Sequence, residues 1–167
     1  MSFHLEVLST IQKKVLRQLG PIMTQRGFHL VGGTASAIYF GRRHSVDLDW
    51  FTGEHIAEPL RFAQELRGAG VSFITAQIGR GTLHGSASGV RVSFLEYRYP
   101  LLKVPVGWQE FGCLLASLDD LACMKLSAQT WPRPPGSSAF LVRRNEADLM
   151  TSIISQKVHI LAMMRWG

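Results

Sequence analysis

Two aspartates spaced for metal binding are the residues most able to do chemistry in this chain. Asp47 and Asp49 stand two residues apart in an apolar segment, residues 46–51, that predicts a strand. Because side chains alternate along a strand, both carboxylates are expected on one face. Two like charges beside a core, with no counter-charge in the segment, are costly unless a cation neutralises them. The pair is therefore a candidate site for Mg²⁺ or Mn²⁺, which prefer oxygen ligands.

A glycine turn supplies the second half of the candidate site. Gly32, Gly33 and Thr34 follow a short apolar run, residues 28–31, that predicts a buried strand. Glycines let the backbone approach a phosphate, and the amides that open a following helix point toward an anion. Either motif alone is usually a plain turn or a solvated strand edge. In this order and spacing they predict a metal that bridges the carboxylates to a nucleotide triphosphate, which suits phosphoryl or nucleotidyl transfer.

These joined motifs resemble the signature of the DNA polymerase beta-like nucleotidyltransferase superfamily. Within it, residues 30–35 and 43–51 resemble the AbiEii/AbiGii toxin family of bacterial nucleotidyltransferases. Further similarity lies at residues 81–85, 90–95 and 118–126. The resemblance implies a mixed sheet flanked by helices and Mg-dependent transfer of a nucleotide from an NTP to an acceptor. In several relatives the acceptor is RNA, notably tRNA, and the protein is the toxin of a toxin–antitoxin pair.

The resemblance also assigns roles to single residues. It implies that Asp47 and Asp49 are catalytic metal ligands, and that the nucleotide phosphates are contacted by Gly32, Gly33, Thr34 and a catalytic lysine, Lys125. From the residues alone, Lys125 lies on a predicted apolar helix. That placement is equally typical of a surface lysine whose stem covers apolar neighbours.

The chain departs from the family pattern at the third carboxylate that superfamily members carry on a later strand. Ser93 stands where that acid is expected, and Glu96 would point to the opposite face of a regular strand. Catalysis could then rely on two carboxylates, recruit Glu96 through a bulge, or be absent. The alternative function is a catalytically degenerate module that binds nucleotide or RNA, or a protein that only binds an antitoxin.

Other polar and aromatic candidates have plainer interpretations. His44 is expected to be a surface residue because no second histidine or cysteine stands at ligand spacing, and His84 to be a turn residue. Trp50 and Phe51 are expected in the core, although an exposed Trp50 could stack on a base.

The elements that must position these residues follow from hydrophobic periodicity and turn signals. We expect a helix from Leu5 to Gly20-Pro21 or on to Gly27, then a short helix at 35–40. A further helix should begin at Pro59 and another at the capping-box-like pair Ser117 and Asp120. The remaining expectations are a hairpin or meander over 71–99, a loop at 131–138 and a last helix at 145–164.

Composition is that of a globular protein, and its basic charge fits either a polyanionic partner or an ordinary basic soluble protein. The 167 residues are 46% hydrophobic and 18% charged, which is enough apolar material for one compact domain. The expected elements and the family resemblance imply an α/β (α+β) domain over residues 1–130, with a loop and a C-terminal helix in 131–167 as a divergent or incomplete appendage. The net charge of +6 favours phosphate-rich partners. Two distant cysteines exclude a zinc knuckle, and no apolar run could span a membrane, so a cytoplasmic location is expected.

Overall fold

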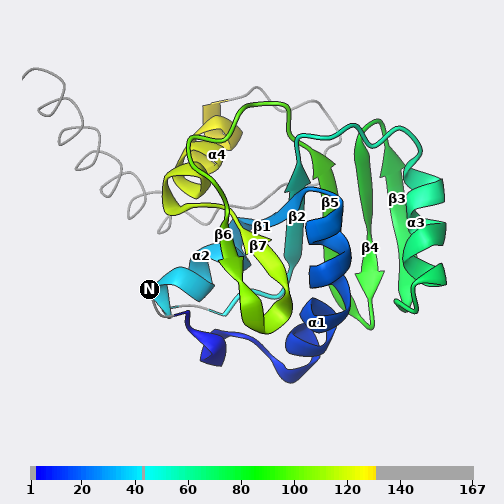
Figure 1. Ribbon diagram of the computed structural model, residues 1–167, viewed down its shortest axis with the longest axis horizontal. Helices are drawn as coiled ribbons and strands as arrows, with labels where there is room; N and C mark the ends of the chain where they lie inside the picture. The colour runs from blue at the N-terminus through cyan, green and yellow to red at the C-terminus, as the bar shows by residue number, and fades with distance from the viewer. Residues whose placement is uncertain (1–2, 43, 131–167) are drawn as a thin grey trace, which may run out of the picture. The chain divides into compact units, whose positions relative to one another are not determined.

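The computed structural model describes residues 3–42 and 44–130, with the side chains of the last five left aside. Its helices are α1 (Thr10–Gln25), α2 (Gly32–Phe40), α3 (Pro59–Gly68) and α4 (Leu118–Thr130), with 3-10 turns η1 (Leu5–Val7) and η2 (Gln109–Phe111) (Figure 1). Its strands are β1 (Phe28–Val31), β2 (Leu48–Thr52), β3 (Phe73–Gly79), β4 (Thr82–Ala87), β5 (Val90–Glu96), β6 (Val106–Trp108) and β7 (Cys113–Leu115).

The strands form one mixed sheet in the order β3-β4-β5-β2-β1-β7-β6. The pairs β2–β5 and β1–β7 are parallel, and the remaining neighbours are antiparallel. In this order β1 and β2 lie in the middle of the sheet, side by side. The expected α/β class, a mixed sheet flanked by helices, is confirmed.

Helix α1 starts later than its apolar periodicity indicates. Leu5 belongs to the separate turn η1, and α1 is capped by Ser9. The Ser9 hydroxyl accepts a hydrogen bond from the Gln12 amide, and the Gln12 side chain accepts one from the Ser9 amide. This capping box satisfies two donors at the helix start. Pro21 lies inside the helix, which continues to Gln25 and so follows the longer of the two expected paths.

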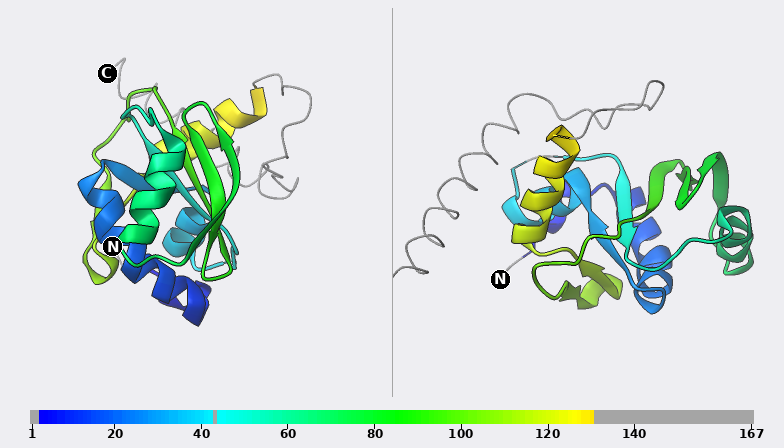
Figure 2. Two further views of the ribbon diagram at one scale, coloured as in Figure 1. Left: turned by 90° about the vertical axis from the view of Figure 1, so that its right-hand side faces the viewer. Right: turned by 90° about the horizontal axis from the view of Figure 1, so that it is seen from above.

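The hydrophobic core lies between the helices and the sheet, with buried side chains from α1, α2 and α3. Phe62 of α3 stacks on Phe28 and makes an edge contact with Phe94. Trp50 is fully buried, as expected for the core. The helix lies beside β3 and β4 at one end of the sheet (Figure 2). Each fully buried aromatic or leucine side chain contributes about 2 kcal/mol to stability, so this layer holds the central strands in register.

Several element boundaries differ from the sequence-based expectations. Strand β2 begins at Leu48, so Asp47 precedes the strand instead of lying within it, and Val46 is exposed. Strand β4 fills the middle of the glycine-rich stretch, which makes the expected meander. The short strands β6 and β7 were not expected. The predicted cap is confirmed, because the Ser117 hydroxyl accepts a hydrogen bond from the amide of Asp120 at the start of α4.

The chain divides into two compact units, residues 1–121 and 122–167. The sheet belongs to the first unit, and the described part of the second is the α4 segment from Ala122 to Thr130. The division into 1–130 and 131–167 stays a prediction, and the expected loop at 131–138 and helix at 145–164 lie outside the described residues. Among the described helices, none is both long and apolar enough to cross a membrane.

Candidate functional site

The glycine turn and the aspartates meet at the end of β1. Val31, the last residue of β1, pairs with Asp49 of β2, and α2 begins at the next residue, Gly32. Gly32 has a φ of +73°, and a Cβ added there would lie 2.6 Å from the Asp49 Oδ2 atom. Only glycine satisfies both the left-handed backbone and the close carboxylate. The two motifs of the sequence therefore form one site.

Asp49 is a buried acid in this site. Its residue surface is 6% exposed, and burial, together with the charge of Asp47, raises the pKa of its carboxyl group to about 6. A hydrogen bond from Ser93 and the charge of Arg91 act in the opposite direction and lower this pKa. These opposing effects leave a carboxylate whose charge is poorly compensated, which favours a cation as its partner.

Asp47 has a counter-charge that the sequence analysis did not find. The Arg91 side chain donates two hydrogen bonds to Asp47, from Nε to Oδ1 at 2.8 Å and from a terminal nitrogen to Oδ2 at 3.1 Å. The expectation of an uncompensated pair was wrong for Asp47, because the cation comes from β5. The period-two pattern of β5 does place Arg91 on the face opposite Val90 and Val92. Only the register against β2 shows that this face meets Asp47.

Ser93 lies directly opposite Asp49 in the register of β2 and β5. The next strand adds His84, which is opposite Ser93 and whose Nδ1 atom lies 2.9 Å from the Ser93 hydroxyl. The expectation that His84 is a turn residue was wrong, since it lies within β4. Burial lowers the pKa of its imidazole. A polar row Asp49–Ser93–His84 thus crosses three strands.

Glu96 does not replace the missing third carboxylate. It is opposite Thr52, three residues along the strand from the Asp49–Ser93 pair, and the β2–β5 register is unbroken. Its carboxylate is hydrogen-bonded to His55 and Arg98. The side chain that faces Asp49 from β5 is therefore a serine.

The remaining predicted site residues are placed as follows. The Thr34 hydroxyl is buried and donates a hydrogen bond to the backbone carbonyl of Asp47, so it holds the segment that carries the aspartates. Gly33 faces Ser45, whose Oγ would lie 3.1 Å from an added Cβ. Lys125 is half-buried on α4 in the second unit, and its predicted role stays a prediction. His44 is exposed, as expected.

The donor set suits a metal that is shared with a ligand. No group of three His, Cys, Asp or Glu side chains that could hold a metal occurs in the described part of the chain. Mg²⁺ keeps several waters and is typically bound through one or two carboxylates plus substrate phosphates. Asp47 and Asp49 fit that arrangement, and they do not fit a metal held by protein alone.

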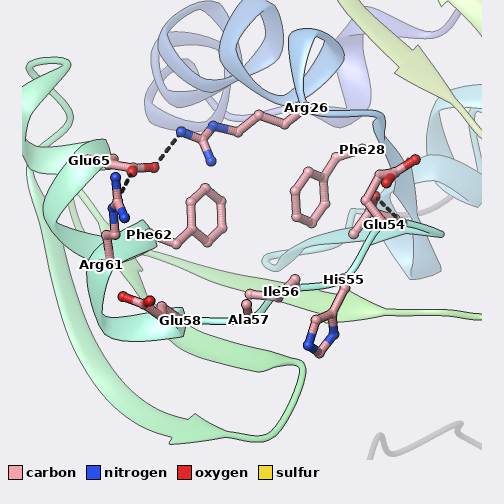
Figure 3. A pocket seen from close by; sticks show the side chains of 11 residues that line it. Arg26, Phe28, Glu54, His55, Ile56, Ala57, Glu58, Arg61, Phe62 and Glu65 are labelled. Carbon is pink, nitrogen blue, oxygen red and sulfur yellow. Dashed lines mark hydrogen bonds and ion pairs between the residues drawn. The ribbon is translucent and has the colours of Figure 1, made fainter.

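A separate cavity of about 340 Å³ lies at the other end of β1 and β2 (Figure 3). It is bordered by Phe28 and Thr52, which are opposite each other at the strand ends remote from Asp49. Arg26 and Arg61 line it and both pair with Glu65, so these charges are already compensated. The carboxylate site lies outside this cavity.

Comparison with known proteins finds similarity to a sequence relative and to several solved structures. An uncharacterized protein of Aquifex aeolicus (strain VF5), aq_aa25, is 33% identical over 119 residues, which are 70% of this chain and 57% of that protein. The chain thus spans a little over half the length of this relative. No family model matches the chain, so membership of the AbiEii/AbiGii family stays a prediction.

The similar solved structures are distant. A candidate nucleotidyltransferase from H. pylori is 15% identical, with a TM-score of 0.49 over 71% of this chain and 59% of that one. A tRNA-processing enzyme in an apo form is 18% identical, with a TM-score of 0.46; the match covers 71% of this chain and 36% of that enzyme. The Megavirus polyadenylate synthase is 11% identical, with a TM-score of 0.46; the match covers 83% of this chain and 36% of that enzyme. Alignments this loose transfer no ligand and no activity.

Proposed function

We propose that this protein is a Mg-dependent nucleotidyltransferase that moves a nucleoside monophosphate from an NTP to an RNA acceptor, such as tRNA, and releases pyrophosphate. One observation carries the proposal: the buried carboxylate of Asp49 contacts Gly32 at the start of α2, with Asp47 beside it. A cation site and an anion site thus share one edge of the sheet, as a metal–triphosphate complex requires.

Different groups of the chain would bind the metal ion and the phosphates of the nucleotide. Asp47 and Asp49 would hold Mg²⁺ or Mn²⁺, which when bound would neutralise charge on the triphosphate. No side chain in the described ranges caps α2, so the first amides of this nine-residue helix remain as donors for phosphate oxygens. Lys125 would add a further cation toward the phosphates, as the family resemblance implies.

Arg91 would change partners when the nucleotide binds. Its guanidinium covers both oxygens of Asp47, so a metal can use those oxygens only if Arg91 moves away. The Arg91 side chain is 73% exposed, so little packing opposes a change of its position. Guanidinium groups bind phosphate as readily as carboxylate, so the incoming triphosphate offers Arg91 a replacement partner.

Ser93 favours a second candidate function, binding without catalysis. A serine hydroxyl is a poor base, and it stands where a third carboxylate would accept the proton of the acceptor hydroxyl. A protein built in this way could bind a nucleotide, RNA or an antitoxin without turning over.

A transfer assay tests the proposal directly. The protein is incubated with each radiolabelled NTP, Mg²⁺ and total tRNA, alongside Asp49→Asn and the surface control Glu110→Gln, whose carboxylate pairs with Arg17 away from the site. We expect label on RNA for the wild type and the control, and none for Asp49→Asn. No transfer with any NTP, or equal transfer by Asp49→Asn, would exclude the enzyme.

Calorimetry separates the second candidate, because Mg-dependent NTP binding without pyrophosphate release identifies a binding module. The toxin role has its own test in cells. Induction of the wild-type chain should arrest growth, whereas Asp49→Asn at equal abundance should not. Arrest by both proteins would mean that any toxicity does not depend on this site.

A further inference from the structure

The face of the sheet that carries Asp49 has accessible side chains on β5, β4 and β3. Burial alternates along β4, where Leu83 and Ala87 are buried and His84 is half-exposed. Strand β5 alternates in the same way, with Val92 buried and Arg91 exposed. Helix α3 packs on the buried side of β3 and β4. The half-buried and exposed side chains of these strands therefore lie on the face that Asp49 shares.

Three aromatic rings stand in a row on this face. Phe51 follows Asp49 by two residues, so it shares the Asp49 face and begins about 7 Å farther along β2. Its ring stacks on Tyr97 with centroids 5.2 Å apart and an interplanar angle of 24°. The rings of Tyr97 and Tyr99 are in contact, with centroids 5.3 Å apart, and Tyr99 is 59% exposed. We call Phe51, Tyr97 and Tyr99 the aromatic row.

The row replaces the stacking residue that the sequence suggested. Trp50 is fully buried on the other face, and Phe51, expected in the core, is only half-buried. The backbone fixes where the row lies, because the Tyr97 amide donates a hydrogen bond to the Thr52 carbonyl at 2.7 Å. The backbone of Tyr97, in the middle of the row, is therefore tied to the end of β2.

Basic side chains lie beyond both ends of the row. Arg91 is exposed beside the aspartates. Arg80 is exposed in the β3–β4 turn, which lies at the Tyr97 end because the Gly81 carbonyl accepts a hydrogen bond from the Glu96 amide. Flat rings accept any nucleobase face, and flanking guanidinium groups attract the phosphates that join the bases. A protein partner would explain the apolar rings but gives no reason for their continuity with a carboxylate site.

We propose that the aromatic row is the surface on which unpaired bases of the acceptor RNA stack. The inference rests on the proposed function, and it names the path by which the acceptor reaches the site. A single strand lying along the row would have its terminal hydroxyl near Asp49. Base-paired RNA would bind poorly, because its bases are already stacked on one another.

Binding of a labelled single-stranded oligoadenylate, measured by fluorescence anisotropy, tests this role. We expect Tyr99→Leu to weaken binding about tenfold, since one base–aromatic stack contributes about 1–3 kcal/mol. Tyr99→Trp should retain binding because it keeps a flat ring. Val104→Ala, at an exposed apolar position of the loop after the row, should have no effect. The same oligonucleotide annealed to its complement should bind more weakly than the single strand.

Mg·NTP affinity, measured by calorimetry on the same variants, keeps this test separate from that of the proposed function. We expect it to be unchanged in Tyr99→Leu and lost in Asp49→Asn. The inference is overturned if the wild type does not bind the single strand, or if Tyr99→Leu binds it normally. It is also overturned if Tyr99→Leu loses NTP affinity alone, which would make the row a nucleotide subsite. Self-association that falls in Tyr99→Leu, without RNA binding by the wild type, would assign the row to a protein contact.

Discussion

Removal of Arg91 should act in opposite directions on metal binding and on nucleotide binding. In Arg91→Ala, Asp47 loses both guanidinium hydrogen bonds, which lie at 2.8 and 3.1 Å. The pair is largely exposed, at 73% and 39% of the two side chains, so its strength is that of a surface ion pair, at most about 1 kcal/mol. The same substitution removes the repulsion between a cationic side chain and a divalent ion a few ångströms away, about 1–2 kcal/mol in water.

Both effects favour the metal and together amount to about 1–3 kcal/mol, so Mn²⁺ should bind the nucleotide-free variant about five- to 150-fold more tightly than the wild type. Mg·NTP affinity should fall about tenfold or more, because a charge-assisted hydrogen bond to phosphate contributes about 1.5–3 kcal/mol. Titration of free Mn²⁺ by electron paramagnetic resonance measures the first quantity, and calorimetry with a non-hydrolysable NTP measures the second.

Arg91→Lys is the matched control for this prediction. It keeps the positive charge and loses the two-pronged geometry, so its Mn²⁺ affinity should stay near that of the wild type. Unchanged or weaker Mn²⁺ binding by Arg91→Ala, in a variant whose thermal unfolding is normal, would mean that Asp47 does not bind the metal. The reasoning that joins the two motifs into one metal site would then be refuted.

Three further predictions concern stability and the geometry of the site. His29 is buried, which lowers the pKa of its imidazole to about 4, so only the unfolded state takes up its proton between pH 6.5 and 4. In urea denaturation the wild type should therefore lose about 2 kcal/mol more stability than His29→Gln between pH 7.5 and pH 5. Gly32→Ala should lower the free energy of unfolding by about 1–2 kcal/mol, because the backbone at Gly32 is left-handed, and it should weaken NTP binding, because the added methyl group displaces Asp49. The control Gly68→Ala has open space around the added methyl group and should change neither quantity. Asp120→Ala should lower the free energy of unfolding by about 2 kcal/mol, because the amides of Leu102 and Lys103 and the capping hydroxyl of Ser117 lose their acceptor. Thermal unfolding measures this loss, and a loss below about 0.5 kcal/mol would show that water replaces the carboxylate.

Local features of the fold were readable in the sequence. The strand at 28–31, the helix that begins at Pro59 and the cap formed by Ser117 and Asp120 were all expected and are present. Each depends on groups within a few residues of one another, so periodicity and capping chemistry suffice to predict it. The combination of Gly32 with Asp49 was also expected, because their order along the chain predicts a strand–turn–helix beside a second strand.

The surroundings of the aspartates were decided by tertiary structure. Arg91 reaches Asp47 across 44 residues of chain, and Ser93 meets Asp49 only because β5 pairs with β2 in one particular register. A shift of that register by one residue would exchange Arg91 and Ser93 for their apolar neighbours. The sequence shows that these side chains exist, but the register of β5 against β2 cannot be predicted from it.

Tertiary structure also decided which face of β2 is buried. The alternation of a strand requires Trp50 and Phe51 to point in opposite directions, and both are apolar. The sequence by itself determined that these two side chains lie on different faces and that Asp49 shares a face with Phe51. Only the packing of other elements on the sheet decided that Trp50 is buried and that Phe51 is half-buried, because burial depends on which elements come together across the sheet.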